Sequence, residues 1–146
     1  MHTRIYGSAI EEPLRAELHR ELERRIAAVN RQWATGEYDP QAEPVAGDFQ
    51  GVQYAPWYEG ETFAADRLGW IEGSRAAAAA GKGKGWHWTV RDAAFYPRSV
   101  DETIAVYTVV HRFGREPVPP GEAVFLETWV RLGGRWHLRR HTAEKR

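Results

Sequence analysis

Apolar residues recur at helical spacing near the start of the chain. Successive steps of four, four, four, three and four residues place on one helical face Leu14, Leu18, Leu22, Ile26, Val29 and Trp33. The other positions are rich in Glu and Arg, and Glu21 precedes Arg25 at the i,i+4 spacing that favours pairing on a helix. The pattern predicts a long amphipathic helix over 14–33, ending before Gly36, with its charged side chains in solvent.

The next part of the chain is less regular. Residues 37–48 contain two prolines and Gly47, and 49–54 read as a short strand that ends at Pro56. Thr62 is a suitable N-cap for a second helix that continues through the alanine-rich residues 76–80. Residues 81–85, Gly-Lys-Gly-Lys-Gly, predict a loop, but they lack the P-loop spacing and its Ser or Thr. We therefore expect no phosphate site there.

The C-terminal part of the chain reads as sheet. Segments rich in Val, Thr and aromatic residues, each bounded by turn residues, predict strands at 86–96, 103–113, 123–132 and 135–142. The order of helix, short strand, helix and then a run of strands indicates an α+β fold. With no internal repeat and no linker, we expect a single domain over residues 1–146.

Charge and composition restrict the partners. The 20 Lys and Arg residues balance the 20 Asp and Glu residues, so no overall field attracts nucleic acid or an anionic membrane, and neither is expected as a partner. No apolar stretch approaches the roughly 18 residues of a membrane span, and the N-terminus lacks the apolar block of a secretory signal. We therefore expect a cytoplasmic protein. Seven Trp residues against one Met are unusual.

Three local patterns carry a resemblance to a known group of proteins. The helix that ends in Trp33 is followed by Gly-Glu-Tyr-Asp at 36–39, and Glu-Gly-Glu at 59–61 precedes the second helix. The hairpin 127–138 contains a Gly-Gly turn and closes with tryptophan and an aliphatic residue. In this layout the chain resembles the nuclear-transport-factor-two-like superfamily, in particular its polyketide-cyclase-like and ketosteroid-isomerase-like members.

The resemblance implies a fold and a range of functions. It implies a curved antiparallel sheet wrapped around the N-terminal helices, the cone-shaped cystatin-like α+β barrel, with a pocket at its open end and a homodimer through its outer face. The superfamily includes isomerases, cyclases, dehydratases, epoxide hydrolases and proteins without catalysis. The isomerase's aspartate and tyrosine and the epoxide hydrolase's Asp-Arg-Asp set have no matching positions here, so those specific chemistries are not carried over.

The last hairpin can be analysed through its period of two. If Gly133 and Gly134 form the turn, the cross-strand pairs on one face are Arg131 with Trp136, Trp129 with Leu138, Glu127 with Arg140 and Phe125 with Thr142. The opposite face then holds Val124, Leu126, Thr128, Val130, His137, Arg139 and His141. The first face combines aromatic residues with one acid and one base, which is typical of a pocket wall. The second suits an outer surface, and its aliphatic residues predict a homodimer contact.

Four residues are candidates for chemistry. Glu127 is the first candidate for a general acid or base, and Arg140 would stabilise an anion; the alternative is a structural ion pair between them. His111 could move a proton near neutral pH, or could be a half-exposed residue at a strand end. Tyr107 could donate a hydrogen bond to an oxyanion, or pack its ring in the core.

Aromatic side chains predict the binding surface. An apolar or aromatic small molecule is expected to contact Tyr54, Trp57, Trp88, Phe125 and Trp129. No metal site is expected, because His137 and His141 would stand some 13 Å apart along one strand. No cofactor is expected either.

Two functional hypotheses remain open. In the first, the protein is a cofactor-independent isomerase, cyclase or dehydratase acting on an apolar, polyketide-like molecule in a biosynthetic pathway. In the second, the same aromatic pocket binds or sequesters a small molecule without catalysis. A carboxylate or histidine buried in the pocket without a structural partner favours the enzyme, and a pocket lined only by aromatic residues favours the binding protein.

Overall fold

The protein has an α+β fold built from two helices and six strands in the described residues. A computed structural model describes residues 11–54, 62–114 and 120–146. Its elements are α1 (Glu11–Thr35), β1 (Val45–Tyr54), β2 (Thr62–Asp66), α2 (Arg67–Gly81), β3 (His87–Ser99), β4 (Glu102–Arg112), β5 (Gly121–Leu132) and β6 (Arg135–Lys145). The predicted first helix and the four C-terminal strands are confirmed, with ends shifted by a few residues.

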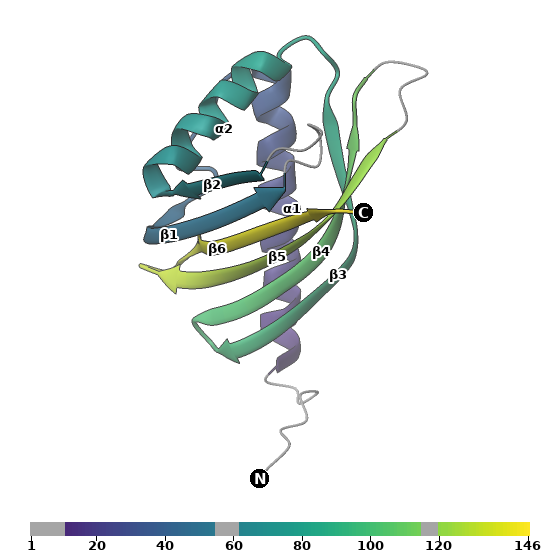
Figure 1. Cartoon of the computed structure of the whole chain (residues 1–146). Coiled ribbons are helices and arrows are strands. Elements are labelled where there is room, and N and C mark those ends of the chain that lie inside the picture. Colours follow the sequence, from purple (N-terminus) through teal and green to yellow (C-terminus); the bar gives the residue numbers. More distant parts are fainter. Residues whose placement is uncertain (1–10, 55–61, 115–119) are drawn as a thin grey trace.

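The strands form one curved, unclosed sheet. Its order is β2-β1-β6-β5-β4-β3, and every neighbouring pair is antiparallel except β1 with β6, which is parallel. The sheet curves around α1 and α2 (Figure 1). The predicted curved sheet around N-terminal helices is confirmed, whereas a purely antiparallel sheet is not. A parallel pair requires a long connection, and β2, α2 and the strands β3–β5 lie between β1 and β6 in the chain.

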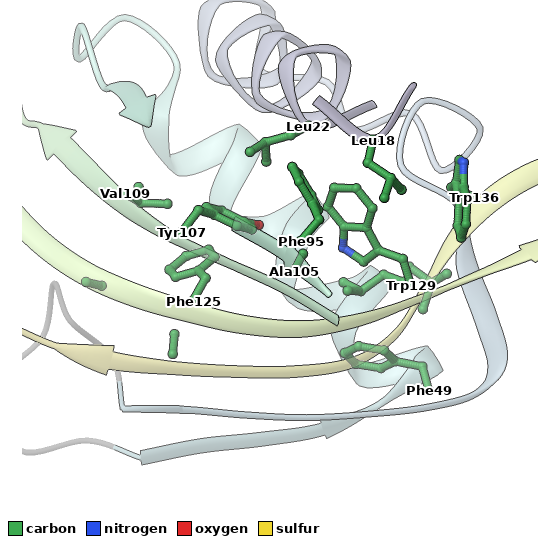
Figure 2. Packing of buried hydrophobic residues seen from close by; sticks show 14 residues of the cluster. Leu18, Leu22, Phe49, Phe95, Ala105, Tyr107, Val109, Phe125, Trp129 and Trp136 are labelled. Atoms are coloured by element: carbon green, nitrogen blue, oxygen red, sulfur yellow. The ribbon is translucent and has the colours of Figure 1, made fainter. Parts of the chain in front are cut away.

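The apolar stripe of α1 forms one side of the core. Leu18 and Leu22 are buried and point onto Phe95 and Trp129 of the sheet (Figure 2). Burying each leucine contributes roughly 1.5–3 kcal/mol. The helix ends at Thr35 because Gly36 adopts a positive φ of 78° and its N–H closes back on the Gln32 carbonyl.

The second helix starts later than the sequence predicts. Residues Thr62–Asp66 pair antiparallel with β1 as strand β2, so Thr62 is not an N-cap. The N-cap is Asp66, whose Oδ1 accepts a hydrogen bond from the Gly69 N–H at 2.9 Å. The difference arises because Thr62 and Phe63 have high β-propensity and pair with β1, so the helix begins only after Asp66.

Strand β6 contains one extra residue. Trp129 lies opposite Leu138 as predicted, but Thr128 lies opposite Arg140, so that Arg139 is left without a cross-strand partner on β5. This is a β-bulge, which shifts every later residue of β6 by one position. The predicted pair of Glu127 with Arg140 is therefore wrong.

The bulge changes which side chains of β6 point inward. Beyond it, Glu127 lies opposite His141 and Phe125 opposite Ala143, in place of the predicted Arg140 and Thr142. His141 is 2% exposed and lies on the inner face, contrary to its predicted place on the outer face. On β4, the odd-numbered residues around Tyr107 are the inward ones.

The end of α2 packs closely against two tryptophans, and this gives a first testable prediction. A Cβ added at Gly81 would stand 2.7 Å from Cδ1 of Trp33 and 2.8 Å from Cε3 of Trp86. We expect Gly81→Ala to lower the free energy of unfolding by about 1–3 kcal/mol, measured by urea denaturation. At Gly73 the added Cβ would only touch Cζ of Phe63 at 3.4 Å, so Gly73→Ala should be neutral or stabilise by about 0.5–1 kcal/mol. Equal stabilities of the two variants would contradict this packing.

None of the helices in the described ranges is both long and apolar enough to cross a membrane.

Candidate functional site

A cavity of about 370 Å³ lies between the two helices and the inner face of the sheet. Helix α1 contributes apolar residues and Arg25, α2 contributes Trp70 and small residues, and β4, β5 and β6 contribute the polar floor. The described lining comprises Arg25, Ile26, Val29, Gln32, Trp33, Glu43, Gln53, Phe63, Trp70, Gly73, Ser74, Ala77, Trp86, Trp88, Tyr107, His111, Phe113, Phe125, Glu127, Leu138 and His141. A mostly aromatic wall with a few polar groups is the usual composition of a small-molecule site.

Glu127 is the centre of a hydrogen-bond network on the floor of the cavity. Its Oε1 accepts hydrogen bonds from the Tyr107 hydroxyl at 2.6 Å and from Nε1 of Trp129 at 3.0 Å. Its Oε2 lies 2.7 Å from Nδ1 of His141. Three neighbours on the adjacent strands β4, β5 and β6 therefore hold one carboxylate in place.

These contacts set the ionisation of the network. Burial works to raise the pKa of Glu127, but the hydrogen bond and charge of His141 and the bonds from Tyr107 and Trp129 together lower it. Glu127 is therefore ionised at neutral pH. Burial, followed by the charge of Glu127 and the hydrogen bond to it, raises the pKa of Tyr107 well above its usual range, so Tyr107 remains a donor.

The key residue that sequence analysis missed is His141. An ionised carboxylate only accepts hydrogen bonds, so Nδ1 of His141 carries the proton in the bond to Glu127. In the neutral ring, Nε2 then presents a lone pair. This Nε2 is buried and has no hydrogen-bond partner within the described part of the chain.

Aromatic rings fix the orientation of His141. The ring of Trp70 lies 4.7 Å from the His141 ring, and the ring of Phe125 lies 4.8 Å away at right angles. All three residues line the cavity. A carboxylate that orients an imidazole ring whose other nitrogen is unpaired is an arrangement suited to proton transfer.

Arg140 lies away from this network. It is exposed, and its guanidinium donates hydrogen bonds to the main-chain oxygens of Asp48 and Arg139. Arg139 also turns outward, where it pairs with the Asp48 carboxylate at 2.8 Å. The predicted role of Arg140 in stabilising an anion in the pocket is therefore wrong, because the bulge directs both arginines outward.

His111 forms a second polar position in the cavity. It is 2% exposed, which contradicts the half-exposed alternative. Its Nδ1 accepts a hydrogen bond from Nε1 of Trp88 at 2.7 Å, so the neutral ring carries its proton on Nε2. Burial lowers the pKa of His111 from 6.5 to about 4, and the ring is neutral at pH 7. It is therefore a weak base, in contrast to its predicted role as a proton shuttle near neutral pH.

The cavity also contains a buried cation. Arg25 is 5% exposed, forms an ion pair with Glu21 at 2.9 Å and donates to the Trp136 carbonyl at 2.9 Å. Its guanidinium lies 5.2 Å from the ring of Trp129. The prediction that this charge is solvated is wrong. The sequence contains a signal of this burial, because position 25 lies on the same helical face as positions 18, 22 and 29.

The predicted aromatic residues are partly confirmed as cavity residues. Trp88 and Phe125 line the cavity, their rings 5.4 Å apart. Trp129 does not, because it is fully buried in the core and contributes only its N–H to Glu127. Trp57 and the side chain of Tyr54 lie outside the described residues. Lining aromatic residues beyond the five predicted contact residues include Trp33, Phe63, Trp70, Trp86 and Phe113.

Metal ligands are not grouped in the part of the chain that the structure describes. No three His, Asp or Glu side chains there are close enough to hold an ion.

Comparisons with known proteins assign the fold. No family model matches the chain, and no curated protein matches it. An NTF2-like protein of unknown function from Pseudomonas putida superposes with a TM-score of 0.69 at 14% identity, over 88% of this chain and 84% of that one. A protein of unknown function with a cystatin-like fold from Nostoc punctiforme gives a TM-score of 0.66 at 14% identity, over 97% and 96%.

A solved enzyme shares the same architecture. The hexachlorocyclohexane dehydrochlorinase LinA-type3 from Novosphingobium barchaimii superposes with a TM-score of 0.61 at 10% identity, over 92% of this chain and 88% of that one. At such low identities the likeness shows the fold and not the chemistry. Together with the curved sheet around two helices, these superpositions show that the chain has the NTF2-like, cystatin-like α+β fold.

Proposed function

We propose that this protein is a cofactor-independent acid–base enzyme, an isomerase or lyase that removes a proton from carbon in an apolar small molecule. The observation that carries the proposal is the buried Nε2 of His141, which has no partner among the described residues and belongs to a ring that lines the cavity. A purely structural histidine normally has both ring nitrogens satisfied when buried. The unsatisfied nitrogen therefore supports a role toward a bound molecule.

Glu127 acts through His141. Among the described residues, the Glu127 carboxylate accepts hydrogen bonds from Tyr107, Trp129 and Nδ1 of His141, and these hold it in place, so it is a positioning residue. When Nε2 of His141 takes a proton, the imidazolium lies 2.7 Å from the Glu127 carboxylate, which stabilises the new charge. The sequence predicts proton transfer by Glu127 or His111, and the proposal gives this role to His141 instead.

The remaining lining residues suit an apolar substrate that becomes anionic. Trp33, Trp70 and Trp88 provide broad apolar surfaces on different elements. Removal of a proton next to a carbonyl group leaves negative charge on the carbonyl oxygen. Among the described lining residues Arg25 alone carries a permanent positive charge, and it would stabilise that oxyanion.

Hydrogen–deuterium exchange tests this function without knowledge of the natural substrate. The protein would be incubated in D2O near neutral pH with benzylacetone, and deuterium at the carbons next to the carbonyl measured by mass spectrometry. The wild type should exceed the buffer-catalysed rate, and His141→Gln should lower the enzymatic rate at least about a hundredfold. His137→Gln, on the outer side of the same strand, is the matched control and should not change it.

Binding is measured on the same samples by quenching of tryptophan fluorescence. Quenching without exchange in the wild type would contradict the enzyme and support the non-catalytic binding protein. Exchange that survives in His141→Gln would contradict the role of His141.

A further inference from the structure

A second carboxyl group lines the cavity and has no part in the mechanism above. Glu43 lies in the connection between α1 and β1, next to Pro44, whose carbonyl accepts the Leu138 N–H at 2.9 Å. Leu138 lies on β6 before the bulge, and both Glu43 and Leu138 line the cavity that contains His141. The backbone at Glu43 is therefore fixed to the strand that carries the proposed base.

The carboxyl group of Glu43 is held in one orientation. Its Oε2 accepts a hydrogen bond at 2.8 Å from Nε2 of Gln32, which is itself 7% exposed and lines the cavity. Because the carbonyl oxygen of a protonated carboxyl group is a better acceptor than its hydroxyl oxygen, the bond from Gln32 favours Oε2 as the unprotonated oxygen. When the group is neutral, its proton resides on Oε1, and no hydrogen bond of Oε1 is found among the described residues.

The surroundings favour the protonated form more than water does. Burial raises the pKa of Glu43, while the charge of Arg25, the hydrogen bond from Gln32 and the charge of Arg24 oppose this and the charge of Glu127 adds to it. The net effect is a raised pKa. The pKa values of the two carboxyl groups of the cavity are thus shifted in opposite directions, that of Glu127 down and that of Glu43 up, which is the pattern expected of two carboxyl groups with separate roles.

We infer that Glu43 is the general acid of this cavity, which protonates a hydroxyl group as it leaves, and that the substrates are β-hydroxy carbonyl compounds. This inference rests on the proposed role of His141. Nε2 of His141 takes the proton from the carbon between the carbonyl and the hydroxyl-bearing carbon. The C–H electron pair becomes the new C=C bond, the C–O bond breaks, and Oε1–H of Glu43 protonates the oxygen to release water. His141 then loses its proton to solvent, and Glu43 regains one from solvent.

A second proton donor separates elimination from isomerisation. In an isomerisation one base can remove a proton and return it at another carbon, so no separate acid is required. Hydroxide is a poor leaving group, and its departure at neutral pH needs a proton at the moment the C–O bond breaks. A carboxyl group that Gln32 orients in the same cavity as the histidine base therefore favours loss of water.

The experiment uses three related probes. Benzylacetone reports proton removal alone, by deuterium exchange. The aldol adduct of benzaldehyde and acetone reports loss of water, followed by the absorbance of benzalacetone. The para-nitrophenyl ether of that adduct has a leaving group that needs no protonation. Glu43→Gln should slow loss of water about a hundredfold or more, and leave exchange and loss of para-nitrophenoxide within about threefold of wild type.

Matched variants make the outcome specific. Glu37→Gln, an exposed residue of the same connection, is the control and should change none of the three rates. Gln32→Met removes the hydrogen bond that orients Glu43 and should also slow loss of water selectively, which keeps the test valid if Glu43→Gln folds poorly. Glu43→Asp should restore part of the rate.

The possible results separate the two proposals. Wild type that exchanges benzylacetone but does not dehydrate the adduct would overturn the role of Glu43 and leave that of His141 intact. Equal losses on all three probes in Glu43→Gln would show a structural role and also overturn it. Wild type that is inactive on all three probes would contradict the proposed function and, with it, this inference.

Discussion

Glu127→Gln should lower the exchange rate of benzylacetone by about two to four orders of magnitude with little change in folding. The amide oxygen can take the place of Oε1 and still accept from Tyr107 and Trp129. The amide nitrogen then faces Nδ1 of His141 and donates to it. The neutral ring must now carry its proton on Nε2, which turns the base into a donor. The substitution therefore removes the lone pair on which catalysis depends.

Comparison of rate and stability distinguishes this mechanism from a structural role. Melting temperature and exchange rate would be measured on one preparation of Glu127→Gln. Glu122→Gln, on the same strand but paired at the surface with Arg91, is the control and should leave the rate unchanged. A normal rate in folded Glu127→Gln would mean that the contact with His141 serves stability alone, and would remove both residues from the catalytic proposal.

Much of the fold follows from local patterns in the sequence. The stripe of α1 from Leu14 to Trp33 determines a helix with one buried face, and the alternation of β5 places Phe125, Glu127 and Trp129 inward, as observed. These features depend only on the 3.6-residue and two-residue periods of helix and strand. The start of α2 was predicted less well, because β2 is short and is stabilised by pairing with β1, which is distant in sequence.

The candidate site was predicted only in part because one bulge decides its composition. Regular alternation after Leu138 would place the Arg140 side chain in the apolar interior. Burying an unpaired charge there would cost a large amount of folding free energy. The bulge avoids this cost by turning Arg139 and Arg140 outward to Asp48, and as a consequence His141 turns inward to Glu127. Two adjacent arginines after an inward leucine were the available signal, and they indicate that strict alternation is unfavourable there.

Burial of the uncharged His111 should make folding sensitive to acid in a defined pH range. Its pKa is about 4 in the folded protein and 6.5 without burial, so between these values the unfolded chain binds more protons. The contribution of neutral His111 to the free energy of unfolding should therefore be fully present above about pH 6.5 and decrease as the pH falls toward 4. Since one pKa unit corresponds to about 1.4 kcal/mol, the loss should reach roughly 2–3 kcal/mol.

The variant His111→Gln isolates this contribution from those of other groups. The amide oxygen can still accept the Trp88 N–H at the position of Nδ1, so the packing around Trp33 and Phe113 is retained while the titrating ring is removed. Urea denaturation of both proteins at pH 7, 5.5 and 4.5 gives the free energies of unfolding. The pKa of Glu127 is lowered, so its contribution to the free energy of unfolding is also lost in acid. This loss occurs in both proteins and cancels in the difference between their free energies of unfolding. The wild type should lose stability relative to His111→Gln as the pH falls through this range, because only the wild type carries an imidazole that must remain neutral when buried. Parallel curves for the two proteins would show that the folded state accommodates a protonated His111, and would contradict its assignment as a permanently neutral residue of the cavity.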